Sequence, residues 1–275
     1  MLKGVHVPHR KNTAGAAPVV MTPPQTVTIP MSMHIGAPAE ITVKVGETVK
    51  VGQPIAKAGG FVSAPIFASV SGKVKKLTEV PGSNGRAMKA VLIESDGLME
   101  PWEELKAPEV TDYQSFVDAV RNSGVVGLGG AGFPTSVKLS VKDLGKVEAF
   151  ILNGAECEPY VTSDTRTMLD DAEWIKEGVG LLEKYMEAKR VIVGIEANKP
   201  QCIEKMRETF AGNGKVEIQA LPPMYPQGGE KQLIGYLKDY GLKKGYMLSF
   251  NFNRNKKPGV QELHFKDYTI VEAVV

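Results

Sequence analysis

The sequence predicts an α/β domain with a Rossmann-like parallel sheet, preceded by a small all-β domain. Residues 27–96 contain many short β-type runs separated by glycine, a pattern typical of a small sandwich or barrel. Residues 111–233 alternate helix-like and strand-like segments, and this alternation predicts parallel strands covered by helices. The run RVIVGI at 190–195 is apolar throughout, as expected of a parallel strand buried on both faces.

The composition of the chain predicts that it is divided into five segments. Residues 1–26 are expected to form an extended arm, because their prolines exclude regular helix. Residues 27–96 form the all-β domain, 97–110 a linker with two prolines and several acids, and 111–233 the α/β domain. Residues 234–275 form an atypical tail with one helix and strands at 245–253, 260–265 and 268–274. His6, His9 and His34 lack the spacing of a metal site, so they are expected to be structural or exposed.

The individual elements rest on local patterns. Alternation and glycine spacing predict β-runs at 27–29, 39–43, 48–51, 54–56, 61–62, 72–77 and 90–93. In the α/β domain, Thr111 is the expected N-cap of a helix ending at Arg121. Further helices are expected around Lys138, at 173–188 and at 199–210, with strands at 149–152 and 215–220. Ligands of such sheets bind at the carboxyl ends of strands, so the segment NGAECEP at 153–159 is a candidate site.

Composition excludes several classes of function. The 275 residues include 33 basic and 31 acidic side chains, and this balance gives no excess of positive charge for binding nucleic acid. No stretch approaches 18 apolar residues and the N-terminus lacks a signal peptide, so direct membrane insertion is not expected. Two cysteines, Cys157 and Cys202, can form neither a disulfide framework nor a four-thiolate cluster, and they suit a reducing cytoplasmic setting.

A glycine-rich segment, GLGGAGFPTSVK at 127–138, is the strongest local motif. Its glycines allow backbone N–H groups to approach a phosphate, and the helix that follows would add Lys138 and the Thr135 hydroxyl. It is not a Walker A loop, because Phe133 stands where that motif requires lysine. A structural glycine-rich turn remains the alternative interpretation. The motif glycines are Gly127, Gly129, Gly130 and Gly132.

Three sequence blocks resemble, in their order, the flavin-binding 51 kDa subunit of respiratory NADH dehydrogenase. They are GLGGAGFPTSVK, NGAECEP and YPQGGEKQL (225–233). More closely, they resemble the C subunit of the Rnf complex, a membrane-bound ferredoxin:NAD oxidoreductase. The segments GVHVPHRK (4–11) and IPMSMHIGAPA (29–39) resemble the same protein, so the resemblance covers roughly residues 4–233. It implies a peripheral electron-transport subunit on the cytoplasmic face of the membrane. Hydride exchange between NADH and FMN would be coupled to ion translocation by partner subunits, with ferredoxin acting indirectly.

The resemblance also implies site residues. Groups that bind FMN are matched by Asn153, Glu156, Tyr225 and Gly228. Acids that contact the nicotinamide nucleotide are matched by Glu158 and Glu230, and an aromatic residue that packs against adenine is matched by Phe133. No catalytic side chain is implied, because the hydride passes between cofactors. Two alternatives stay open: Glu158 and Glu230 could be solvated loop acids, and Cys157 a packed residue.

Several features depart from the family pattern. Leu128 replaces an arginine of the respiratory version, Ser136 a glycine and Gly229 an acid. The later flavin-contacting segment and the motifs for two 4Fe-4S clusters are missing, so the protein is expected to be truncated before its iron–sulfur domain. The tail at 234–275 instead resembles the end of restriction-endonuclease-like domains of AAA-ATPase-linked proteins, without their catalytic acids and lysine. Either a fused reading frame or a divergent ending of the same sheet would explain it.

The all-β segment resembles the barrel-sandwich hybrid of biotinyl and lipoyl carriers, at 44–57 and 63–76. Those carriers attach their cofactor to a lysine at a hairpin tip, but the corresponding GGFVSAP at 59–65 has none, so a docking scaffold is expected. The sequence therefore favours a flavin- and NAD(H)-binding subunit. The alternative is a non-catalytic scaffold with a vestigial flavin site, and a nuclease fragment rests on the tail alone.

Overall fold

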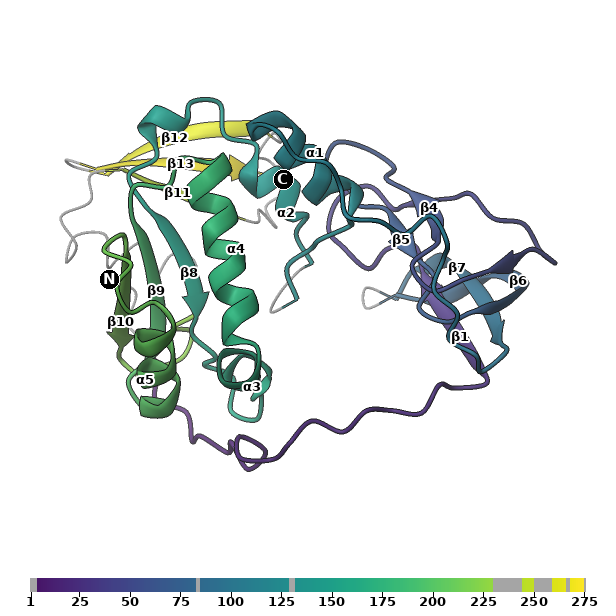
Figure 1. The fold of residues 1–275 in the computed structure, drawn as a ribbon, viewed down its shortest axis with the longest axis horizontal. Helices are drawn as coiled ribbons and strands as arrows, with labels where there is room; N and C mark the ends of the chain where they lie inside the picture. The colour runs from purple at the N-terminus through teal and green to yellow at the C-terminus, as the bar shows by residue number, and fades with distance from the viewer. Residues whose placement is uncertain are drawn as a thin grey trace. The chain divides into compact units, whose positions relative to one another are not determined.

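The computed structural model describes residues 4–82, 85–128 and 132–229, and the backbone of three later strands. The chain divides into two compact units. One, the barrel unit, is residues 20–141, and the other, the α/β unit, joins residues 1–19 to residues 142–275 (Figure 1). Among the described residues, no helix is both long and apolar enough to cross a membrane.

The barrel unit contains two antiparallel sheets. The four-stranded sheet has the order β1-β7-β6-β3, and the three-stranded sheet has the order β2-β4-β5. The strands of the first are β1 (Thr26–Pro30), β3 (Thr48–Val49), β6 (Gly72–Pro81) and β7 (Ala87–Ser95), and those of the second are β2 (Glu40–Ile41), β4 (Pro54–Lys57) and β5 (Ile66–Phe67).

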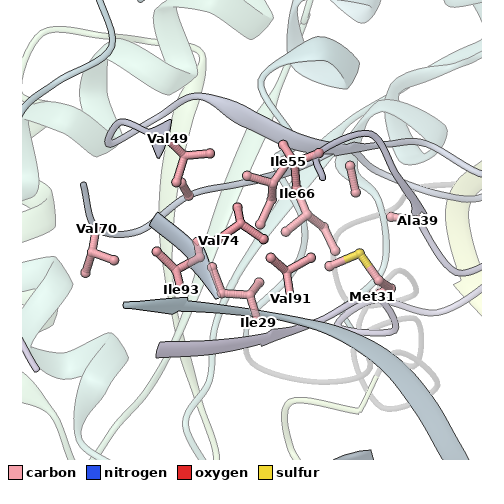
Figure 2. Packing of buried hydrophobic residues seen from close by; sticks show 13 residues of the cluster. Ile29, Met31, Ala39, Val49, Ile55, Ile66, Val70, Val74, Val91 and Ile93 are labelled. Atoms are coloured by element: carbon pink, nitrogen blue, oxygen red, sulfur yellow. The ribbon is translucent and has the colours of Figure 1, made fainter. Parts of the chain in front are cut away.

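Both sheets contribute to one apolar core (Figure 2). Ile29 of β1 and Val91 and Ile93 of β7 pack with Ile55 of β4 and Ile66 of β5. Val91 and Ile93 are fully buried while Leu92 between them is half-buried, which is the alternation expected when one face of a strand lines a core. The predicted run at 61–62 is not a strand, because residues 59–63 form a turn in which the Ser63 hydroxyl accepts from the N–H of Gly59.

Helix α1 (Tyr113–Asn122) and the short helix α2 (Thr135–Leu139) belong to the barrel unit. The N-cap of α1 is Asp112, one residue after the predicted Thr111, and its carboxylate accepts from the N–H of Ser115. After α1 the chain passes close to β5, where a Cβ on Gly124 would lie 2.7 Å from the Phe67 ring. This packing groups residues 111–141 with the barrel, a division that differs from the predicted linker at 97–110.

The α/β unit contains a parallel sheet of order β10-β9-β8, as predicted. All six residues of the central strand β9 are buried, as its apolar run predicted. Val191, Val193 and Ile195 share one face and pack with the helices, including Val179 of α4 and Met206 of α5. The elements are β8 (Phe150–Gly154), α3 (Ser163–Asp170), α4 (Ala172–Tyr185), β9 (Val191–Glu196), α5 (Pro200–Thr209) and β10 (Val216–Leu221), after a 3₁₀ turn, Leu144–Lys146 (Figure 1).

Helix α3 was not predicted. It begins only after the loop 155–162 that follows β8, and its first turn lies against that loop. In the tail, β11 (Lys244–Ser249), β12 (Gly259–Phe265) and β13 (Tyr268–Val274) form a sheet of their own, in the order β11-β13-β12. These strands agree with the predicted ones, but they do not extend the sheet β10-β9-β8. The helix predicted before residue 245 lies outside the described residues.

Candidate functional site

Asn153 lies at the carboxyl end of β8 and joins two of the three predicted blocks. Its side-chain nitrogen donates to the carbonyl oxygen of Gly228 at 2.9 Å, and its side-chain oxygen accepts from the N–H of Ala155 at 3.2 Å. The segments 153–159 and 225–229, which are about 70 residues apart in sequence, therefore meet at one end of the parallel sheet. This is where an open sheet of this kind offers a ligand site.

Gly228 fits tightly against the loop after β8. A Cβ at this position would lie 2.9 Å from the carbonyl oxygen of Ala155 and 3.7 Å from the side-chain nitrogen of Asn153. A side chain there would push the two segments apart. Nearby, Tyr225 is 41% exposed, and its backbone exchanges two hydrogen bonds of 2.8 Å with Val5 of the N-terminal arm.

Lys11 of the arm holds the loop at 155–162. Its ammonium donates to the carbonyl oxygens of Glu156 at 2.7 Å, Glu158 at 2.8 Å and Val161 at 2.6 Å. An ammonium has three protons, so these bonds use its full donor capacity. The side chain of Lys11 is only 15% exposed.

Glu156 is 1% exposed, and both of its carboxylate oxygens are hydrogen-bonded. Oε1 accepts from the N–H of Asp164 at 2.7 Å, at the start of α3. Oε2 accepts from the Thr165 hydroxyl at 2.8 Å and from Lys199 Nζ at 3.0 Å. A flavin contact by this carboxylate, as predicted, would require the buried side chain to be uncovered.

The charges around Glu156 form a buried network of four side chains. Lys199, 5% exposed, lies between Glu156 and Glu196, with its Nζ 3.1 Å from Glu196 Oε2. Lys11 Nζ is 3.6 Å from Glu156 Oε2, so two ammonium groups face two carboxylates. The N–H of Glu156 donates to Glu196 Oε2 at 3.3 Å. This balance matters because an unpaired buried charge is strongly destabilising.

The network shifts several pKa values. Burial raises the pKa of Glu156, but the Thr165 hydroxyl, the Lys199 ammonium and the Asp164 N–H outweigh it, so this pKa lies below the usual range. The pKa of Asp164 is raised, first by burial and then by the Glu156 charge. Burial also raises the pKa of the Cys202 thiol.

The two predicted nucleotide-contacting acids are placed differently. The Glu158 side chain is exposed, while its carbonyl is held by Lys11. Glu230 lies outside the described residues. Between Glu156 and Glu158, Cys157 is a free cysteine, 3% exposed.

The glycine-rich segment lies in the barrel unit. The N–H of Gly127 donates to the carbonyl oxygen of Phe133 at 2.9 Å, which holds the two sides of the glycine-rich loop together. Gly129 and Gly130 lie outside the described residues. Lys138 folds back over this loop. Its Nζ lies 5.8 Å from the centroid of the Phe133 ring and would be 3.7 Å from a Cβ on Gly127.

Two residues of the loop have structural roles. Gly132 has φ +67°, and a Cβ there would lie 2.8 Å from the Met33 carbonyl, so the turn itself requires glycine. Phe133 is 2% exposed, so packing of adenine against its ring would require the ring to be uncovered. Thr135 is half-buried, and its N–H donates to the carbonyl of Val125.

The structure thus brings Asn153, Tyr225 and Gly228 together with the loop 155–162 in one unit, and Gly127, Phe133 and Lys138 together in the other. Sequence patterns missed three of the four network members, Lys11, Glu196 and Lys199, and also Thr165, which donates to Glu156. Only Lys11 carried a signal, because it belongs to the block GVHVPHRK.

In a comparison with known protein families, two successive parts of the chain match two different domain families, and together they define a two-domain class of protein. Residues 1–98 match the family described as the RnfC barrel sandwich hybrid domain. Residues 120–251 match the family described as the Nuo51 FMN-binding domain. The predicted fold, a barrel-sandwich hybrid followed by a parallel-sheet flavin domain, is therefore confirmed.

Within this class, the predicted resemblance to the C subunits of Rnf complexes is confirmed. It is 43% identical to the C subunit of the proton-translocating ferredoxin:NAD(+) oxidoreductase complex of Clostridium ljungdahlii, over 88% of this chain and 54% of that protein. It is 42% identical to the C subunit of the Na(+)-translocating complex of Acetobacterium woodii, over 88% and 56%. A third relative is the C subunit of the ion-translocating oxidoreductase complex of Cronobacter sakazakii, 38% identical over 85% and 30%. The chain spans about half the length of the first two relatives.

The tail needs a correction. The FMN-binding match continues to residue 251, so the resemblance does not end near residue 233 as predicted. The likeness of the tail to a restriction-endonuclease-like domain finds no support in these matches.

Proposed function

We propose that this chain is the flavin- and NAD(H)-binding part of an Rnf-type ferredoxin:NAD oxidoreductase. The observation that carries the proposal is the bond from Asn153 to the carbonyl of Gly228, because it unites two separate blocks at the carboxyl end of β8. The relatives named as ferredoxin:NAD(+) oxidoreductase subunits support the same conclusion.

The residues fit FMN in two respects. Asn153 has an exposed side chain that can donate to and accept from the polar edge of a flavin ring, and Gly228 leaves out the Cβ that would crowd this place. In the glycine-rich segment, Lys138 supplies a positive charge beside Gly127 for the phosphate, and Thr135 a hydroxyl. When bound, FMN would supply the exchange of a hydride with NAD(H) and the release of single electrons.

For NAD(H), we propose that Glu158 binds the nucleotide together with Glu230, and that Phe133 packs against adenine. The exposed carboxylate of Glu158 is available for this role, unlike the buried carboxylate of Glu156. The chain's own residues then bind and orient the two cofactors, and none has to transfer a proton. Glu156 contributes by fixing the loop that carries Glu158.

The partners follow from the named relatives. We propose that this chain exchanges electrons with other Rnf-type membrane and iron–sulfur subunits, that ferredoxin takes part indirectly and that ion translocation occurs in those partners. The chain would lie peripherally, on the cytoplasmic face of the membrane. The 4Fe-4S clusters that the resemblance implies would be ligated by cysteines other than those of this sequence, because its two cysteines cannot hold one.

The test is flavin binding by the purified full chain. We expect flavin absorbance in the wild type and a loss of about tenfold in FMN affinity in Asn153→Ala, since one or two hydrogen bonds are removed. Asn213→Ala is the matched control, because Asn213 also uses both side-chain ends, bonding to Glu183 and Lys215, but precedes β10 at the opposite edge of the sheet. A wild type without affinity for FMN would favour the scaffold hypothesis.

NADH binding is tested by NADH-driven reduction of ferricyanide. Glu158→Gln keeps the size of the side chain and removes its charge, so we expect NADH binding weaker by about 1.5–3 kcal/mol with unchanged flavin content. Glu177→Gln, at an exposed position of α4, is the control substitution. Equal NADH dependence in all three proteins would identify Glu158 as an ordinary solvated acid.

A further inference from the structure

The N-terminal arm bonds to both segments that form the candidate site, as well as to Arg166 and Asn198. At one end Val5 pairs with Tyr225 through two backbone hydrogen bonds. Further along, the N–H of Arg10 donates to the carbonyl of Pro159 at 2.8 Å, and the hydroxyls of Thr13 and Thr162 lie 2.7 Å apart. The arm therefore follows both the Tyr225 segment and the loop after β8.

Lys11 is the centre of this contact. The loop 155–162 contains neither helix nor strand, so its shape depends on what its backbone groups bind. Three of its carbonyls converge on the Lys11 ammonium, from residues 145 to 150 positions away in sequence. Hydrogen bonds from a charged donor are about twice as strong as neutral ones, so this one side chain sets the direction of three peptide groups.

Lys11 binds the main chain of both glutamates of the loop, whose side chains lie in different surroundings. The carbonyls of Glu156 and Glu158 both point to Lys11, while the carboxylate of Glu156 is buried and that of Glu158 is exposed. Lys11 also faces the buried carboxylate of Glu156 at 3.6 Å. Without it, Lys199 alone would balance Glu156 and Glu196.

We propose that Lys11 is a positioning residue for the nucleotide site: it fixes the loop 155–162 so that Glu158 is presented to NAD(H). The inference rests on the proposed function, and it assigns to the arm a task beyond docking. Lys11 does not touch the nucleotide. It acts through the main chain of the residue that does.

The experiment compares Lys11→Met with Arg10→Met in the full chain. Arg10 is the neighbouring cation and its side chain is exposed, so its replacement removes the same charge without affecting the loop carbonyls. In Lys11→Met we expect the KM for NADH to rise about tenfold, as displaced binding groups do, with little change in kcat and in bound flavin. Arg10→Met should behave as wild type.

Amide hydrogen exchange gives a readout that needs neither cofactor. Residues 157–162 should exchange faster in Lys11→Met, whereas β9, buried in the core, should not change. Chemical restoration of the ammonium distinguishes a positioning role of Lys11 from a role in stability alone. Lys11→Cys treated with 2-bromoethylamine regains an ammonium at nearly the same reach, and it should recover both the low KM and the slow exchange. The native Cys202 is buried in the core, and Cys157 is replaced by alanine in this background because it lies in the loop that the substitution loosens.

The outcomes are distinguishable. If the wild type binds flavin and NADH, and Lys11→Met shows the wild-type KM, the inference is overturned. If Lys11→Met exchanges faster in β9 as well, or if the restored ammonium returns stability but not the low KM, Lys11 is only a stabilising residue and the inference fails. If Lys11→Met does not fold, Lys11→Gln takes its place; its amide has two protons for three carbonyls, so an unchanged KM in it overturns the inference. A wild type that binds neither cofactor overturns the proposed function, while the exchange of 157–162 still reports the hold of Lys11 on the loop.

Discussion

The barrel unit and the α/β unit bury different kinds of side chain. The barrel core consists of thirteen aliphatic and methionine side chains from two antiparallel sheets and the loops between their strands (Figure 2). Buried polar residues beside it, such as Ser63 and Ser71, are uncharged. The α/β unit also has an apolar core, but within the described chain it alone buries carboxylates and an ammonium group, those of Glu156, Glu196 and Lys199. Its charges lie beside the candidate site, at the carboxyl ends of β8 and β9.

This difference shows two ways of fixing a structure. Apolar packing has no direction, so it stabilises the barrel without committing any one side chain to one partner. A buried charge must find opposite charge and hydrogen bonds, and it is costly if either is lost. The charges of the α/β unit therefore tie one particular loop and one particular arm to the sheet, which suits a site whose geometry has to be kept.

The largest effect should come from Lys199→Met. It leaves Glu156 and Glu196 buried with one fewer cation, so we expect a loss of about 3–5 kcal/mol in the free energy of unfolding of the α/β unit. Amide exchange of β9 measures this unit separately from the barrel. Lys189→Met, an exposed lysine before β9, is the control. Equal stability of the two variants would show that the network contributes nothing to the fold.

A somewhat smaller effect is expected in the barrel. Ile55 is fully buried between the two sheets, and Ile55→Ala removes apolar volume without exposing a charge, at a cost of about 2–4 kcal/mol. Leu77→Ala, at a residue 41% exposed, should cost much less. Amide exchange of β7 measures the loss of stability in the barrel unit. Because the two units have separate cores, we expect the amide exchange of β9 to stay unchanged. A change in β9 would mean that the two cores are energetically coupled.

The smallest effect concerns pH. Because the pKa of Glu156 is lowered in the fold, its contribution to stability is present above its unfolded value of 4.5 and is lost as the pH falls through the folded value. The raised pKa of Asp164 acts oppositely, since its contribution is present below 3.8 and is lost as the pH rises.

Glu156→Gln should therefore be less stable than wild type at pH 7, and its stability should fall less on acidification below about pH 4.5. Asp164→Asn should steepen that fall. Urea denaturation across this pH range measures both, with the exposed Glu158→Gln as control. Identical acid profiles of Glu156→Gln and wild type would contradict the lowered pKa.

The sequence by itself determined most of the secondary structure. Alternation along a strand and continuous apolar runs are local patterns, so they located the barrel strands and the buried β9 within a few residues. The motif blocks also located Asn153, Glu158, Tyr225 and Gly228 as a candidate site, and the structure joins the first and last of these by a hydrogen bond. Helix α3 was missed because its eight residues are too few to show a clear helical periodicity.

Only the tertiary structure decided which charges are buried and what holds them. Nothing near Glu156 in the sequence distinguishes it from Glu158, yet one carboxylate meets Lys199 inside the unit and the other faces water. Likewise the grouping of residues 111–141 with the barrel depends on close approaches such as that of Gly124 to Phe67. The physical reason is distance along the chain: Lys11 and Glu156 are 145 residues apart, and the path that brings an ammonium to three carbonyls is set by the whole fold, not by any local pattern.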